Sequence, residues 1–163
     1  MNPNISISKR GPGAAKVQAD LDRVLRQEVL VGIPQATTIR RGDKINNASL
    51  LYILTHGSPI RNIPATPVIE PAIVAEGNRQ EITAELKTAA KAVLDENPVQ
   101  AKAALRRAGQ AGANAAIRWF KDPRNGWPPN APSTIRRKGS DSRNIDTGAL
   151  RKSLTFVVRE VNQ

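Results

Sequence analysis

Hydrophobic residues recur at helical spacing in four stretches of the chain, at residues 14–28, 47–57, 79–95 and 98–121. A repeat of three to four residues places them on one face of a helix, as in an amphipathic helix packed on a core. In the last stretch this face is built mostly from small residues, namely Ala101, Ala104, Leu105, Ala108, Gly112, Ala115 and Trp119. We predict four helices. The small residues of the last helix either let a sheet or another helix approach closely or simply reflect helix propensity.

Capping residues give the expected limits of two of these helices. Asn47 is the predicted N-cap of the second helix, and Gly57 is its predicted end. Asn97 and Pro98 together start the last helix, because asparagine accepts hydrogen bonds from free amides and proline is tolerated at the first helical position.

β-Branched and aromatic residues dominate two short stretches, residues 28–33 and 152–161, which we predict to be strands. Residues 58–71 contain four prolines, which exclude a helix interior or a central strand. We expect this stretch to be a shaped connector, in which part of residues 58–70 forms an edge strand. The predicted fold class is therefore α+β, with a small, mostly antiparallel sheet packed against the long helix at residues 98–121.

The predicted organisation is one α+β domain at residues 14–163, preceded by an extended arm at residues 1–13. The arm carries glycine and proline and is expected to reach a neighbouring subunit. Residues 121–147 are predicted to form a long, irregular loop that is rich in proline and basic side chains. An irregular loop of this length is uncommon inside a compact domain unless it binds something, so we expect it to contact a partner.

Positive charge is concentrated in one part of the chain. The formal net charge is +11, of which residues 101–152 contribute +9, from twelve basic and three acidic side chains. Such a segment is expected to face a polyanion or an acidic protein surface, although a solvated face is the alternative. The five aromatic residues are not interleaved with the basic clusters, so base-stacking recognition of single strands is not indicated.

The residue inventory offers little for catalysis. The chain has no cysteine, which excludes disulfides, thiolate metal sites and cysteine nucleophiles. Its single histidine, His56, falls at a predicted helix end, where it can interact with the helix dipole. Metal-ligand spacing and a phosphate-binding glycine loop are both missing from the sequence. We therefore expect no catalytic residue, metal or cofactor, and a protein that is not an enzyme.

The N-terminus lacks the apolar core of a signal peptide, and no stretch approaches the roughly 20 apolar residues that cross a bilayer. We therefore expect a soluble, intracellular protein without a membrane partner.

The stretch PPNAPSTIRRKGSDSRNIDTGALRKSLTF at residues 128–156 carries a dense set of turn and basic residues. Within it, Asp146, Thr147 and Gly148 are expected to form a structural turn, because Gly148 supplies a backbone angle that other residues resist. This stretch resembles the C-terminal signature of the tailed-bacteriophage neck and tail-completion family. The matching positions are Asn130, Ala131, Pro132, Thr134, Ile135, Lys138, Gly139, Ile145, Asp146, Thr147, Gly148, Leu150, Ser153 and Phe156.

Upstream, residues 31–33, the helix end at His56 and Gly57, and the proline connector at residues 63–67 also resemble this family. Two positions depart from its pattern. His56 precedes Gly57 where the family commonly has an acid, and Thr66 stands between two prolines where it commonly has an arginine.

The resemblance implies a virion protein of the phage neck, assembled in the host cytoplasm, that joins the head connector to the tail. It would form a six- or twelve-fold ring of copies of itself and contact adjacent neck, connector and tail-tube or tail-terminator proteins. The candidate residues for subunit or non-specific DNA-channel contacts are Lys9, Arg10, Arg136, Arg137, Lys138 and Arg143. The alternative interpretation, suggested by the net charge, is a sequence-independent nucleic-acid-binding protein.

Overall fold

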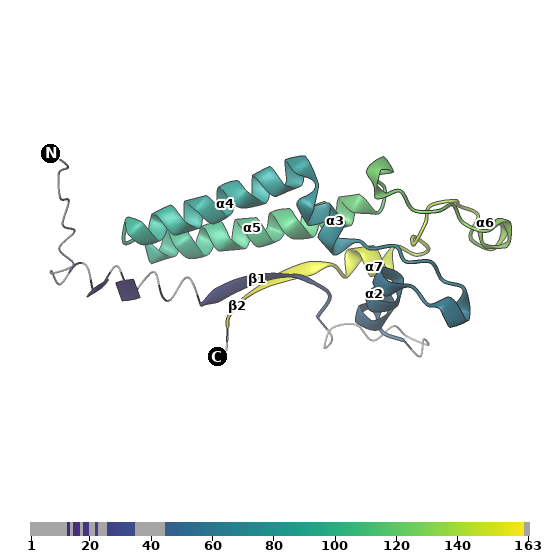
Figure 1. Ribbon diagram of the computed structural model, residues 1–163, viewed down its shortest axis with the longest axis horizontal. Coiled ribbons are helices and arrows are strands. Elements are labelled where there is room, and N and C mark those ends of the chain that lie inside the picture. Colours follow the sequence, from purple (N-terminus) through teal and green to yellow (C-terminus); the bar gives the residue numbers. More distant parts are fainter. Residues whose placement is uncertain are drawn as a thin grey trace, which may run out of the picture.

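The computed structural model describes residues 26–34 and 45–161, together with a few single positions between 13 and 22. Over residues 26–34 and 45–161, two strands, six α-helices and two short 3₁₀ turns follow one another. Figure 1 shows an elongated molecule. A helical hairpin lies over a two-stranded sheet in one part of it, and the smaller helices lie toward the other end of the long axis. The elements are β1 (Gln27–Gly32), α2 (Asn47–His56), η2 (Pro59–Arg61), α3 (Ile69–Val74), α4 (Glu76–Leu94), α5 (Pro98–Trp119), η3 (Pro123–Asn125), α6 (Pro132–Lys138), α7 (Ala149–Lys152) and β2 (Thr155–Glu160).

The sheet joins the first and last strands of the described chain. β1 and β2 are antiparallel, with Val29 opposite Val158 and Val31 opposite Phe156. These four side chains share one face because side chains alternate along a strand, and that face lies on α5. The predicted α+β class, with an antiparallel sheet packed against a long helix, is confirmed.

The prediction of a strand within residues 58–70 is wrong. Residues Pro59–Arg61 form a 3₁₀ turn, and a single β-bridge joins Ser58 to Ile63. The prolines explain the difference, because each removes a backbone donor and fixes a φ angle that does not suit a regular ladder. The connector role of this stretch remains.

Glycines on α5 let the sheet approach the helix backbone. A Cβ atom built on Gly109 would lie 2.7 Å from Cγ of Phe156, and one built on Gly112 would lie 2.8 Å from Cγ2 of Val31. Both distances are far below van der Waals contact, so the helix surface is flat where the strands cross it. The close approach predicted from the small residues of α5 is confirmed, and all seven residues of the predicted face are buried.

The largest buried cluster lies where the C-terminal end of α5 meets the smaller helices. It includes Trp119 and Phe120, and α2, α3 and α7 contribute Leu51, Ala72 and Leu150. A second cluster lies between the α4–α5 hairpin and the sheet. We call the first cluster the Trp119 cluster, and it supports the loops and turns described below.

Most predicted helix limits agree with the structure, and two need correction, namely the N-cap of the second helix and the end of the first helix. The Asn97 side chain accepts a hydrogen bond from Gln100 N at 3.0 Å, as predicted, but α2 is capped by Asn46, whose Oδ1 accepts from Ser49 N at 2.7 Å. Asn47 is instead buried and donates to Ser153 Oγ. The predicted first helix ends earlier than residue 28, since β1 begins at Gln27. Its described positions between 13 and 22 are helical, and residues 1–12 of the predicted arm lie outside the described residues.

The segment at residues 121–147 is less irregular than predicted. It contains the 3₁₀ turn η3 and the two-turn helix α6, which begins at Pro132 and ends at Gly139 with φ 67°. A proline at the first position and a glycine after the last are the usual limits of a short helix. None of the described helices is both long enough and apolar enough to cross a membrane.

Candidate functional site

Part of the segment at residues 128–156 lines one surface hollow of about 240 Å³, which we call the signature hollow. Residues far apart in the sequence form its wall, because α2, α6 and the turn before α7 converge there. The lining residues are Leu50, Leu54, Asn130, Thr134, Lys138, Asn144, Asp146, Thr147, Gly148, Ala149 and Leu150. Seven of these eleven are positions on which the expected resemblance to the neck family rests.

Polar side chains hold the loop around α6 in shape. Arg143 donates from one Nη atom to the carbonyls of Pro128 and Pro129, at 2.9 and 2.7 Å. Lys138 Nζ donates to the carbonyl of Ser142 at 2.8 Å, and Asn130 Nδ2 donates to that of Asp141 at 2.9 Å. Two of the predicted contact residues, Lys138 and Arg143, therefore have partners within the loop itself.

Arg136 and Arg137 differ from these two residues. Both are exposed in the last turn of α6, and neither forms a hydrogen bond or ion pair with any described residue. Their charge near the helix C-terminus also suits the helix dipole. They are the part of the predicted basic surface that is open to a partner, whereas Lys9 and Arg10 lie outside the described residues.

The predicted turn at residues 146–148 is present. Gly148 has φ 76°, which lies in the left-handed region, and Thr147 Oγ1 accepts a hydrogen bond from Ala149 N at 3.3 Å. The turn does not lead directly into the last strand, because the single helical turn α7 comes between them. Asp146 is exposed at the edge of the hollow.

Thr66 connects the proline connector to the signature segment, a link that the sequence did not reveal. It is fully buried, and its amide and hydroxyl groups both donate to the carbonyl of Leu54, at 2.6 and 3.2 Å. Its Oγ1 also accepts a hydrogen bond from Asn144 Nδ2 at 2.9 Å. The threonine at this position therefore has a structural role.

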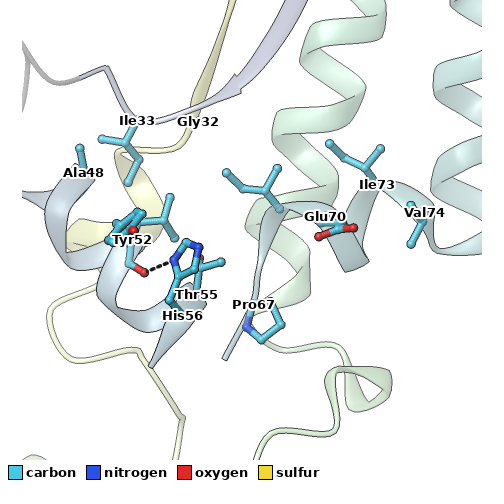
Figure 2. Close-up of a pocket in the computed structure, with 12 residues that line it drawn as sticks. Gly32, Ile33, Ala48, Tyr52, Thr55, His56, Pro67, Glu70, Ile73 and Val74 are labelled. Carbon is cyan, nitrogen blue, oxygen red and sulfur yellow. Dashed lines mark hydrogen bonds between the residues drawn. The ribbon is translucent and has the colours of Figure 1, made fainter. Parts of the chain in front are cut away.

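A second, apolar groove of about 590 Å³ lies between α2 and α3. Figure 2 shows side chains from α2 and from residues 67–74 facing one another across it, with Ile33 at one end. The lining residues are Gly32, Ile33, Ala48, Leu51, Tyr52, Thr55, His56, Pro67, Ile69, Glu70, Ile73 and Val74. We call this surface the α2–α3 groove, and no pattern in the sequence predicted it.

One wall of the α2–α3 groove carries an aromatic pair, and the other wall carries a carboxylate. His56 occupies the last turn of α2, as predicted, and its Nδ1 lies 2.9 Å from the carbonyl oxygen of Tyr52. The two rings are 4.2 Å apart between centroids. Glu70 is exposed and forms no ion pair within the described part of the chain. The groove therefore presents apolar surface with one carboxylate on its lining.

The titration of one carboxylate is shifted by its surroundings. Hydrogen bonds from the side chain and backbone of Arg124 lower the pKa of Asp122 to about 2. The guanidinium also lies over the Trp119 ring, 5.7 Å from its centroid. This pair closes the end of α5 and serves structure. Among the described residues, no three His, Asp or Glu side chains are arranged to hold a metal ion.

Comparison of the chain with models of known protein families, with curated proteins and with solved structures finds no match.

Proposed function

We propose that this chain is a structural subunit of a tailed-bacteriophage neck. In this role it joins the head connector to the tail as one member of a ring, works by binding rather than by catalysis, and belongs to the virion after assembly in the host cytoplasm. Its partners are further copies of itself together with adjacent connector, neck and tail proteins.

The observation that carries the proposal is the arrangement of the C-terminal signature. Seven signature residues line one surface hollow, although they are spread from residue 130 to residue 150. A segment that served only as a spacer between a helix and a strand would not need to place these side chains around one hollow. Loops held on a rigid scaffold are common binding surfaces. The segment is held in shape by Arg143 and Lys138 and leaves Arg136 and Arg137 exposed. These features suit an assembly contact.

Electron microscopy of lysates from a phage that lacks this gene, with a complemented control, tests the role. Filled heads beside separate tails are expected. Tails of abnormal length would move the assignment to tail termination, and intact infectious particles would contradict it.

A finer test replaces Arg136 and Arg137 by alanine in the complementing copy. We expect fewer joined particles, because these two exposed cations have no partner within the described chain. A matched control replaces Arg107, whose Nε is 2.8 Å from Glu85 on the helical hairpin. Normal joining by the first variant would remove the proposed role of α6.

The exposure of Arg136 and Arg137 also favours a second candidate, a sequence-independent nucleic-acid-binding protein. It predicts tight DNA binding by the isolated chain, with an affinity that falls steeply with salt concentration because counterions are released. The neck proposal predicts weak binding before assembly. Fluorescence anisotropy with a short duplex at two salt concentrations separates the two functions.

A further inference from the structure

A rigid turn presents one isoleucine almost entirely to solvent. Ile60 lies in η2 and is 99% exposed, the highest value among the large hydrophobic residues of the described chain. Residues 58–63, which we call the 58–63 tip, are held by paired backbone hydrogen bonds between Ser58 and Ile63, at 2.8 and 2.9 Å. Two further bonds, from Arg61 N to Ser58 O and from Asn62 N to Pro59 O, close the 3₁₀ turn.

The base of the tip is fixed as well. Gly57 has φ 74°, and a Cβ atom there would lie 2.9 Å from both Ala65 N and Ile63 O, so the two ends of the tip are in close contact. Buried Thr66 then anchors the exit of the tip to Leu54 of α2. Because the tip is held at both ends, Ile60 cannot turn inward to find cover. Its exposure is built into the fold.

The α2–α3 groove offers complementary chemistry on the same chain. Tyr52 is 66% exposed and Val74 is 58% exposed, so the groove leaves apolar surface open. Glu70 on its lining lacks an ion-pair partner among the described residues, while Arg61 next to Ile60 is an exposed cation that also lacks one. Tip and groove thus match in both apolar character and charge.

We infer that the 58–63 tip of one copy of this chain docks in the α2–α3 groove of the next copy. Ile60 enters the apolar groove, and Arg61 meets Glu70 of the neighbour. Each copy gives its tip to one neighbour and receives the tip of another, so the inferred contact is heterologous, and a heterologous contact whose rotation closes generates a ring. The inference rests on the proposed ring assembly and names the contact that would build it.

Sedimentation velocity across a range of protein concentrations tests the contact with the full-length chain. The wild-type chain is expected to self-associate, and Ile60→Asp is expected to weaken this association by about tenfold or more, because an apolar anchor is lost and a charge is buried. Val99→Asp is the matched control, since Val99 is also strongly exposed but lies at the start of α5. Circular dichroism verifies that each variant is folded.

Mixing two defective chains tests the head-to-tail geometry. Ile60→Asp retains an intact groove, and Tyr52→Arg retains an intact tip while placing a cation in the groove. At a concentration at which the wild-type chain associates, each alone should be mostly monomeric, and a mixture should form a one-to-one dimer that grows no further. Arg61→Glu should weaken association by about two- to fivefold, and Glu70→Arg added to the same chain should restore it.

The outcomes separate this contact from the neck role itself. Undiminished association of Ile60→Asp, or failure of the mixed chains to form a dimer, would overturn the contact even if the wild-type chain forms rings. A wild-type chain that stays monomeric at every concentration would also overturn it. In each case the morphology of particles from the phage lacking the gene still decides the neck role independently.

Discussion

Gly109 provides the most direct test of how the sheet is packed on α5. Replacing it by alanine adds one methyl group that would lie 2.7 Å from Cγ of Phe156 and closer still to Cδ2. Optimal separation between carbon atoms is about 3.5–4.0 Å, so either the ring or the strand that carries it must move. The displaced atoms belong to the ring near its attachment, which leaves little freedom for local adjustment.

Two effects oppose each other in Gly109→Ala. Alanine favours the helix by about 1 kcal/mol relative to glycine. Overpacking a tight contact costs about 1–3 kcal/mol, and the severity of this overlap places it in the upper part of that range. We therefore expect a net loss of about 1–2 kcal/mol in the free energy of unfolding. For a chain of this size, that corresponds to a decrease in Tm of roughly 3–6 °C.

Urea denaturation followed by circular dichroism measures the effect. Gly77→Ala is the matched control, because Gly77 is an exposed glycine in the first turn of α4 with no atom within 4 Å of a built Cβ, and this variant should gain stability. Combining Gly109→Ala with Phe156→Leu should reduce the cost of the first change, as expected for two residues in contact. A Gly109→Ala protein as stable as the wild type would refute the close-packing explanation.

Three further predictions concern residues outside the hairpin. Thr66→Val should lower the free energy of unfolding in urea by about 1–3 kcal/mol, because Asn144 Nδ2 loses its acceptor at a partly buried site. Gly57→Ala should lower Tm clearly, since alanine resists φ 74° and its Cβ would overlap the following backbone; an unchanged Tm would contradict the rigid base of the tip. The lowered pKa of Asp122, about 2, means that its pair with Arg124 stabilises the fold fully above about pH 4 and that this stabilisation is lost as the pH falls toward 2. The wild type should therefore lose more stability than Asp122→Asn between pH 4 and pH 2, and equal losses would exclude this contribution.

The elements that could be predicted from the sequence are those with strong local signals. Asn97 and Pro98 define the start of α5, and its small residues at helical spacing define the buried face. β-Branched residues identify β1 and β2, and their pairing follows from their shared packing against α5. In these cases the residues that specify an element lie within it, so local reasoning is sufficient.

The errors arose where a local signal was weak or had two meanings. Helix α6 has seven residues and no apolar periodicity, so the sequence indicated a loop, although Pro132 and Gly139 mark its two ends. Asn46 and Asn47 are equivalent as caps in the sequence, and burial of Asn47 against Ser153, more than 100 residues away, decides between them. Tertiary contacts of this kind cannot be inferred from neighbouring residues.

The candidate binding surfaces were the least predictable features, for the same physical reason. Ile60 lies beside Pro59 in a connector, and its exposure results from the backbone bonds that close the 58–63 tip. The α2–α3 groove combines residues from β1 to α3 that the sequence assigns to separate elements. The buried core of the chain therefore lies in the hairpin, the sheet and the Trp119 cluster, and its exposed apolar surfaces lie on short segments that hydrogen bonds hold beside that core.

Ile60 contributes almost no buried area within its own chain. Replacing it should therefore change self-association and leave the stability of the monomer nearly unaltered, whereas Gly109→Ala should lower the stability of the monomer and leave self-association nearly unaltered.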